Sequence, residues 1–566
     1  MDIISSLCYQ NTSTLLSTSS RVLTQRQLLF PNSINVFSDR KYIVISTLSV
    51  VFGTYILWHT TIRQKRRRDT DVKLVSGGLP FLGHVLESSR DSAAFIKRCK
   101  TERGPAFRIK LLNQELYVVT GKLIPEVYQN MKLYNFHDPH SEVLPIHWIQ
   151  ELCYGHKFKG EQIGPHDKQP VIYTLQHNFK ANQVHVFSKR IQEGTSMALE
   201  RFINIKPGEK KVFPVGDVMP FLISQVMSFC LAGRKAGTSS EFTDALVSFT
   251  RKVCKSGFIH TVLPDWIGVP IIKHFFSVEQ ELDLFMDMLV PELENILQLK
   301  QAKELFSSTY GRSNNDDDQD EEEPTFLSMV LFGLSKSNGQ VRTPKEAAYH
   351  YPGMALAGVI AVTPTVLFVL YELAYQAVTS TFVEELRAEL GKLEEWTPDS
   401  IGRNKLLDSL MRETLRYKVS AITSPHRTTA DAVLSNGETI PSGSVVITAP
   451  HDAHIDPSNN TSASFHDKAL PLDQFDPYRF MHIPDDSKTS TSIGPDFLTF
   501  GLFGRACPGR FFALNMIKYI IAELIMHYNI TLVSPNKRPK DSEYFGTLRL
   551  APTTPLMFEK RENCKK

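Results

Sequence analysis

Uncharged, mostly apolar residues run without a break from Tyr42 to Ile62, a stretch long enough to cross a bilayer core of about 30 Å. Only two basic residues lie immediately before it, whereas five follow at once: Arg63, Lys65, Arg66, Arg67 and Arg68. Positive charge gathers on the cytosolic side of membrane helices. The pattern therefore predicts a lumenal tail over residues 1–41, a single transmembrane anchor over 42–62 and a basic linker over 63–79, with the rest of the chain in the cytosol.

Two other interpretations of this stretch are weaker. A cleaved signal peptide would stand nearer the start of the chain and would be followed by a cleavage site with small residues, which the sequence lacks. A buried core helix rarely ends in a run such as RQKRRR.

Residues 80–566 show the patterns of one large globular body. Short alternating runs at Ala106–Lys110 and Leu116–Thr120 predict a β-hairpin around Asn113. From there to about residue 400 apolar residues recur three and four apart, which predicts mostly helices, and a strong helix is expected from Pro508 to Tyr528. Proline and glycine punctuate residues 417–500, which favours irregular structure there. The expected fold is mainly α with a small β region near its N-terminal half.

Composition, charge and cysteine spacing give no reason to expect a nucleic-acid-binding, zinc-binding or disulfide-rich protein. The chain of 566 residues is 42% hydrophobic, which is enough to bury a large core. Its net charge of +3, with no long basic stretch beyond the anchor's flank, gives no reason to expect a nucleic-acid partner. The seven cysteines are scattered without a CxxC pair, so neither a zinc site nor a disulfide framework is expected, which suits a reducing compartment.

The most informative segment is the run from Phe500 to Arg510, FGLFGRACPGR, in which Cys507 stands just before the predicted helix. Unpaired N–H groups and the positive end of the helix dipole favour a thiolate over a thiol at such a position. A thiolate binds metal ions, and Arg505, two residues earlier, suits an anionic group. By itself the segment could equally be a loop with a buried structural cysteine.

This run resembles the haem-binding signature of the cytochrome P-450 family, with Phe, Gly, Arg, Cys and Gly at the family's spacing. Three further segments resemble the family in the same order. Glu413 and Arg416 are three residues apart on a predicted helix and can form an ion pair. Arg479, in FDPYRF, corresponds to the arginine that completes a Glu–Arg–Arg cluster behind the haem. PHR resembles the family's strand that lends an arginine, here Arg427, to a haem propionate.

The resemblance implies the cytochrome P-450 fold and a haem b cofactor with Cys507 as the axial ligand of the iron. It also implies propionate contacts from Arg505 and Arg427, and a structural role for Glu413, Arg416 and Arg479. The expected reaction is oxidation of a lipophilic small molecule by dioxygen, with electrons from NADPH through a separate NADPH–cytochrome P-450 reductase. The expected location is the endoplasmic reticulum membrane. Segments such as HDAHIDP and ACPGRFFA resemble fungal members that modify terpenoids, indole-terpenes or similar secondary metabolites.

Two departures from the family pattern bear on mechanism. Phe503 stands where the family usually has glycine, and we expect the turn to shift by one residue to Gly504. In the apolar helix expected over Tyr351–Val378, Ile360 and Ala361 occupy the positions of the family's acid–alcohol pair, which relays protons to the oxygen site.

Neither Ile360 nor Ala361 can carry a proton. Pro364 cannot donate to the carbonyl of Ile360, so a helix kink is expected there, with a free carbonyl where a water could bind. Thr363 is then the candidate hydroxyl for a relay, unless it bonds back to its own helix. The missing pair keeps open a haem-thiolate isomerase or cyclase that needs no reductase. A non-catalytic haem-binding protein is a further alternative.

Overall fold

The computed structural model describes residues 71–562, apart from residues 81, 113, 137–147, 150, 153–168, 311–323, 334–341, 459–469, 482–487 and 535–536. The predicted lumenal tail, the anchor and the first part of the basic linker therefore lie outside the described residues.

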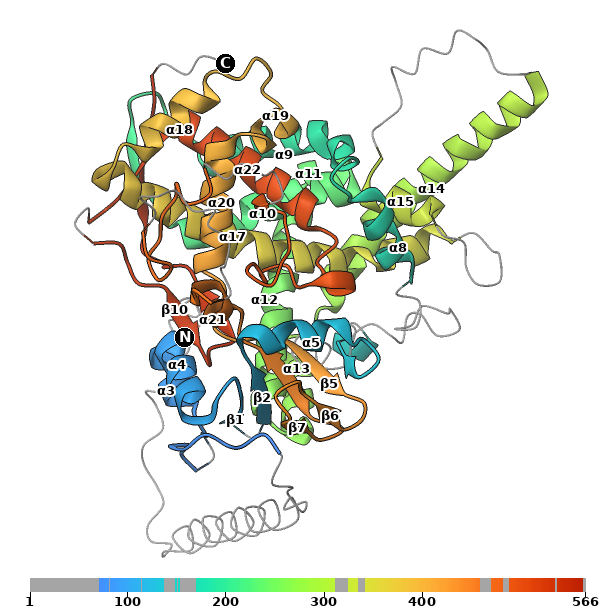
Figure 1. The fold of residues 1–566 in the computed structure, drawn as a ribbon. Helices are drawn as coiled ribbons and strands as arrows, with labels where there is room; N and C mark the ends of the chain where they lie inside the picture. Colours follow the sequence, from blue (N-terminus) through green and yellow to red (C-terminus); the bar gives the residue numbers. More distant parts are fainter. Residues whose placement is uncertain are drawn as a thin grey trace, which may run out of the picture.

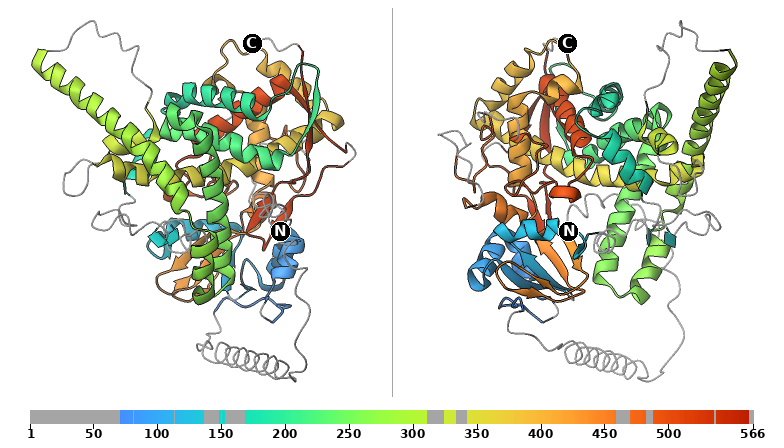
Figure 2. Two further views of the ribbon diagram at one scale, coloured as in Figure 1. Left: turned by 180° about the vertical axis from the view of Figure 1, so that it is seen from behind. Right: turned by 45° about the vertical axis from the view of Figure 1, so that its right-hand side comes forward.

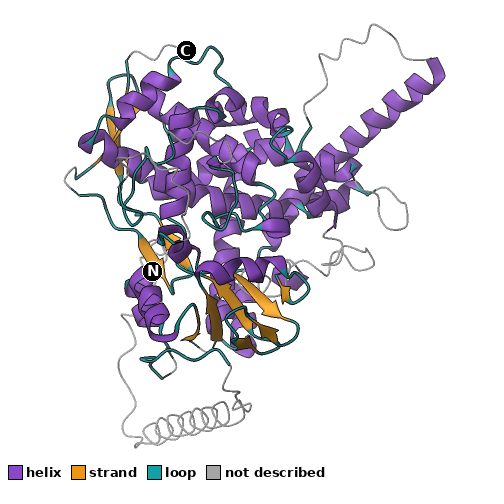
Figure 3. Cartoon of the chain, in the orientation of Figure 1, coloured by secondary structure: helices purple, strands orange, loops and turns teal. Residues whose placement is uncertain are grey.

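Helices make up most of the described chain (Figures 1 and 3). Their bounds are α3 (Val85–Arg90), α4 (Ser92–Arg103), α5 (Ile124–Gln129), α8 (Gln169–Asn178), α9 (Ser188–Phe202), α10 (Val215–Ala232), α11 (Arg234–Thr238), α12 (Ser240–Val262), α13 (Asp265–Phe275), α14 (Glu279–Tyr310), α15 (Phe326–Phe332), α16 (Pro344–Tyr349), α17 (Tyr351–Thr379), α18 (Phe382–Leu390), α19 (Pro398–Gly402), α20 (Lys405–Tyr417), α21 (Pro450–Ile455) and α22 (Arg510–His527).

The largest apolar core forms where α17 crosses the molecule (Figure 1). This helix packs against α10, α20 and α22. Gly358 faces α10, and a β-carbon there would lie 1.9 Å from the Cε atom at the flexible end of the Met227 side chain, which would have to shift. Helix α17 ends one residue later than predicted, and α22 lies inside the range predicted for it. The long apolar periodicities are thus those of buried core helices.

A five-stranded sheet, in the order β1-β2-β8-β5-β3, forms the main β region. Its strands are β1 (Ala106–Leu111), β2 (Gln114–Val119), β3 (Tyr134–Asn135), β5 (Thr423–Thr428) and β8 (Val445–Thr448). Ala106 pairs with Val119 in an antiparallel ladder, so the predicted hairpin is confirmed. The expectation of irregular structure over residues 417–500 is wrong in part, because β5 and β8 come from that stretch. Short strands in a proline- and glycine-rich segment gave little periodic signal.

The remaining strands form three small sheets. A three-stranded sheet has the order β4-β12-β9, from β4 (Lys210–Phe213), β12 (Leu556–Lys560) and β9 (Tyr528–Leu532). Two-stranded sheets join β6 (Ala432–Val433) to β7 (Thr439–Ile440) and β10 (Ser542–Tyr544) to β11 (Leu548–Leu550). The five-stranded sheet lies at one end of the molecule, together with α3, α4 and α13 (Figures 1 and 2).

Two stretches of the described chain are long and apolar enough to cross a membrane, Val215–Ala232 and Pro344–Thr379. Their most apolar windows are 78% and 56% buried inside the protein. Both stretches belong to the core around α17, so their apolar character is explained by packing.

Candidate functional site

Cys507 lies between a 3-10 turn at Phe503–Arg505 and the first residue of α22. Its own N–H donates to the carbonyl oxygen of Phe500 at 2.7 Å, and the backbone N–H groups of Gly509 and Arg510 donate toward its sulfur. The thiol is accessible on one side although protein surrounds most of it. Burial raises the pKa of Cys507, whereas the two N–H groups and the Arg510 charge lower it. The sulfur is thus held where coordination to a metal would complete its deprotonation.

The segment from residue 497 to residue 509, here named the cysteine loop, contains two residues with left-handed backbone conformation. Gly501 has φ 75°, and a β-carbon there would lie 2.9 Å from the carbonyl oxygen of Arg505, so glycine is required. Phe503 has φ 51°, which is unusual for an aromatic residue.

The predicted shift of the turn to Gly504 is therefore wrong, because Phe503 itself takes the left-handed conformation and Gly504 does not. Backbone hydrogen bonds from Arg505 to Leu502 and from Ala506 to Phe503 close the turn around the original residues. The Phe503 side chain is 46% exposed.

Arg505 and Arg427 both contact the region of strand β3, Arg505 through its side chain and Arg427 through backbone pairing. Arg505 donates from Nη2 to the carbonyl oxygen of Tyr134 and, at 3.0 Å, to that of Met131. The next residue of the strand, Asn135, pairs with Arg427 in β5. The Nη1 atom of Arg505 is buried without a hydrogen-bond partner among the described residues, and burial lowers the pKa of this guanidinium. The side chain of Arg427 donates from Nη1 to the carbonyl oxygen of Gly443 at 3.2 Å, and the unpaired nitrogen of Arg505 suits a carboxylate such as a haem propionate.

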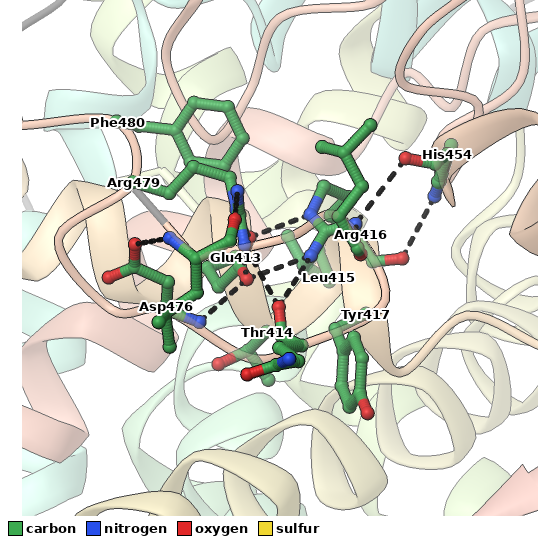
Figure 4. A network of polar contacts seen from close by, with 12 residues as sticks. Glu413, Thr414, Leu415, Arg416, Tyr417, His454, Asp476, Arg479 and Phe480 are labelled. Atoms are coloured by element: carbon green, nitrogen blue, oxygen red, sulfur yellow. Dashed lines mark hydrogen bonds and ion pairs between the residues drawn. The ribbon is translucent and has the colours of Figure 1, made fainter. Parts of the chain in front are cut away.

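Glu413, Arg416 and Arg479, here named the Glu–Arg–Arg cluster, meet in the interior (Figure 4). The carboxylate of Glu413 is fully buried and accepts from Arg416 at 2.7 and 2.8 Å and from Arg479 at 3.2 Å. The other guanidinium nitrogens donate to carbonyl oxygens of Leu470, Pro471, Leu472 and Gln474. Both cations are thus fully bonded, and they hold the 470–474 segment against α20.

Helix α17 carries an accessible stripe on an otherwise buried surface. Ala357 and Ala361 are exposed and Thr365 is half-buried, and residues four apart share one face of a helix. The hydroxyl of Thr365 donates to the carbonyl oxygen of Ala361 at 2.9 Å.

Thr363 lies about 200° round the helix from Ala361. It is 6% exposed, and its hydroxyl has no hydrogen-bond partner among the described residues. The secondary structure continues through Pro364 without a break. Thr365 shares the accessible face of Ala361 but bonds back to its own helix, whereas the Thr363 hydroxyl does not, and the relay role of Thr363 stays a prediction.

Two residues of interest were not singled out from the sequence. The spacing of four from Ala361 could have identified Thr365. His454, in α21, donates or accepts at both ring nitrogens, and no pattern in the sequence indicated its partners.

Comparison with known proteins agrees with this geometry. The cytochrome P-450 family model matches residues 75–558. Cytochrome P-450 monooxygenase 103 of Postia placenta is 22% identical over 92% of this chain and 98% of its own length. Dihydro-ML-236C monooxygenase of Penicillium citrinum is 34% identical over 37% of this chain and 39% of its own length. The solved structure of a retinoic acid-bound cyanobacterial relative, CYP120A1, has a TM-score of 0.60 at 18% identity and covers 87% of this chain and 100% of that chain. The chain therefore belongs to the cytochrome P-450 family of monooxygenases.

Proposed function

We propose that this chain is a haem-thiolate monooxygenase that oxidises a lipophilic small molecule with electrons from a separate NADPH–cytochrome P-450 reductase. The observation that carries the proposal is the position of Cys507, whose accessible sulfur faces two backbone N–H groups on the same loop as the unpaired Arg505 nitrogen. When bound, the haem supplies the activation of dioxygen that inserts one oxygen atom into a C–H bond or alkene.

The residues of the site divide into three roles in this proposal. Cys507 is the axial ligand, and its two N–H donors stabilise the thiolate charge. Arg505 and Arg427 bind the propionates and so orient the cofactor. The Glu–Arg–Arg cluster holds the segments behind the cysteine loop in place, without contact to the reacting atoms.

A test of the reaction class uses the full chain in membranes together with the reductase. Extracts of a host that makes the chain, with and without its neighbouring biosynthetic genes, would supply candidate substrates. We expect product that carries oxygen from isotopically labelled dioxygen, with matching consumption of NADPH. Product formed without NADPH consumption would instead favour the isomerase or cyclase alternative, which the missing acid–alcohol pair suggests.

We propose a lipophilic secondary metabolite, such as a terpenoid or indole-terpene, as the substrate class. The names of two relatives, Dihydro-ML-236C monooxygenase and Dihydromonacolin L monooxygenase, support secondary metabolism in general. Each aligns with about a third of this chain, so they do not distinguish one metabolite class from another.

For proton delivery we propose Thr365, which shares the accessible stripe of α17 with Ala361. Its hydroxyl donates to the Ala361 carbonyl oxygen, and rotation away from this bond would let it donate to a bound water at the oxygen site. Thr365→Val should raise the peroxide formed per NADPH oxidised several-fold, while haem content and substrate affinity stay unchanged. Thr363→Val is the matched control, because it removes a hydroxyl two residues away on the buried side. A rise in peroxide for Thr363→Val alone would restore Thr363 as the relay.

We also propose that the chain is anchored in the endoplasmic reticulum membrane by residues 42–62, with its catalytic body in the cytosol. The exposed apolar side chains of α13, Trp266 at 78% and Phe275 at 67%, support a second contact at the sheet end of the molecule.

Removal of residues 1–68 should release a soluble, haem-loaded body. If the truncated protein still pellets with membranes, Trp266→Glu with Phe275→Glu should release it. A truncated protein that pellets with and without these changes would contradict the second contact at α13.

A further inference from the structure

His454 connects two parts of the site that are far apart in the sequence, and Figure 4 shows the side toward Arg416. The residue is fully buried in α21, and its Nε2 accepts from the backbone N–H of Leu498 at 2.7 Å. Because an N–H group can donate only to an unprotonated nitrogen, the ring proton lies on Nδ1, which donates to the carbonyl oxygen of Arg416 at 2.9 Å. The two bonds fix one neutral tautomer of the ring.

The Arg416 side of this bridge belongs to the Glu–Arg–Arg cluster. Arg416 also donates from Nη1 to the carbonyl oxygen of His454 at 3.3 Å, so helix α20 and helix α21 are joined in both directions. Burial, together with the charges of Arg416 and Arg412, lowers the pKa of His454 to about 3. The ring therefore stays neutral, with its Nε2 available as an acceptor, at every physiological pH.

The Leu498 side of the bridge belongs to the cysteine loop. Phe497 stacks on the His454 ring with centroids 5.7 Å apart, and the Arg412 guanidinium lies 4.1 Å from the Phe497 centroid. Two residues beyond Leu498, the carbonyl oxygen of Phe500 accepts the N–H of Cys507. A continuous path of hydrogen bonds and short chain segments thus runs from the buried cluster to the residue that carries the sulfur.

We propose that His454 is a positioning residue that sets the cysteine loop relative to the Glu–Arg–Arg cluster and so holds the Cys507 sulfur in its ligand geometry. The proposal rests on the proposed role of Cys507 as the haem ligand. A histidine that only fills core space would contribute through its shape, whereas a positioning histidine contributes through its two hydrogen bonds. Variants that keep the shape but change the bonds separate these two roles.

The experiment compares His454→Phe, His454→Gln and His454→Asn in the full-length chain, with His451→Phe as the matched control. His451 is buried in the same short helix, and its ring lies 6.5 Å from that of Tyr417. The readouts are haem content, melting temperature and the reduced carbon monoxide spectrum, in which the thiolate-ligated form absorbs at about 450 nm.

His454→Phe keeps a stacking ring but neither accepts nor donates, so we expect a several-fold rise in the fraction of the complex that absorbs at shorter wavelength. His454→Gln should retain most of the thiolate band, because its amide oxygen can accept from Leu498. His454→Asn should lose it, because its shorter side chain serves only the Arg416 carbonyl. His451→Phe should leave the ratio unchanged.

An unchanged band ratio in His454→Phe would overturn the proposal. If His454→Phe does not fold, the Gln and Asn variants decide, and equal thiolate fractions in these two would also overturn it. Failure of the proposed role of Cys507 gives a different result, since the unmodified protein would then show no thiolate band.

Discussion

The Glu–Arg–Arg cluster and helix α17, on two sides of the site, differ in how their polar groups are paired. Behind the cysteine loop, the Glu–Arg–Arg cluster buries three charges, and each carboxylate oxygen and each guanidinium nitrogen has a partner within hydrogen-bond distance. In α17, the positions of the acid–alcohol pair are apolar, and the buried hydroxyl of Thr363 has no partner in the described chain. Polar groups are satisfied where the protein must be rigid, and they are missing where the family usually places its proton relay.

This contrast separates a polar, hydrogen-bonded side of the site from an apolar one. In the cluster and the cysteine loop the charges are paired and the Cys507 N–H is bonded, even beside Phe503, whose φ is 51°. Helix α17 keeps the helix and its packing but not the side chains of the relay. Substitutions in the Glu–Arg–Arg cluster should therefore lower the free energy of unfolding strongly, and substitutions of the α17 threonines should change it little.

The largest expected effect is at Glu413. Glu413→Ala leaves two buried arginines without their carboxylate, which should cost about 3–5 kcal/mol in the free energy of unfolding and give aggregated, haem-free protein. Arg416→Ala and Arg479→Ala should behave alike. The control is Glu389→Ala, which breaks an exposed pair with Lys392 and should cost at most about 1 kcal/mol. Recovery of Glu413→Ala as a stable haem protein would remove the contrast between the two regions.

The next largest expected effect is a loss of stability at low pH, caused by two buried histidines. The pKa of His454 and that of His451 are both lowered to about 3 by burial and nearby cations, whereas in the unfolded chain each titrates near its ordinary value. The unfolded state then binds more protons below about pH 6.5, so stability is full above that pH and falls as pH decreases, by about 1.4 kcal/mol per pH unit per histidine. The measurement is the free energy of unfolding between about pH 7 and pH 5. His454→Gln should reduce this slope, and an unchanged slope would show that the ring titrates normally.

A smaller effect, in this case a gain in stability, is expected at Phe503. Phe503→Gly relieves the left-handed strain of a residue with a β-carbon, at some cost in chain entropy, so stability should rise by about 1 kcal/mol. Phe503→Ala removes the ring but keeps the β-carbon, and it should not give this gain. Thermal unfolding of both variants is the measurement. A loss of stability in Phe503→Gly would mean that ring contacts outweigh the backbone strain.

The smallest expected effect is at Thr363. Thr363→Val removes a buried hydroxyl that lacks a partner and keeps the branched shape, so unfolding should require up to about 1 kcal/mol more. Thr365→Val, whose hydroxyl does have a partner, should not be stabilised. Equal changes in the free energy of unfolding for the two variants would indicate that the Thr363 hydroxyl also has a hydrogen-bond partner.

The sequence predicted the helices and the cysteine loop better than it predicted the sheet and the polar contacts. Long apolar periodicity located α17 and α22 to within a few residues, because packing in a core imposes a regular spacing. Strand β8 was missed, since a strand of four residues in a stretch rich in proline and glycine carries little local signal, whereas the family resemblance did indicate a strand at PHR, within β5. The turn at Phe503 was placed wrongly, because residue preference favoured Gly504 while the loop's hydrogen bonds fixed the register. His454 could not be found, since its partners lie 38 and 44 residues away in the sequence.

The most direct test of the account is the reduced carbon monoxide spectrum of Cys507→Ser, compared with Cys254→Ser as the control. Cys254 lies in α12, away from the cysteine loop, and its replacement should leave the thiolate band intact. Cys507→Ser should give protein without that band, or without haem. A Cys507→Ser protein that retains the full thiolate band would show that another cysteine is the ligand and would contradict the account.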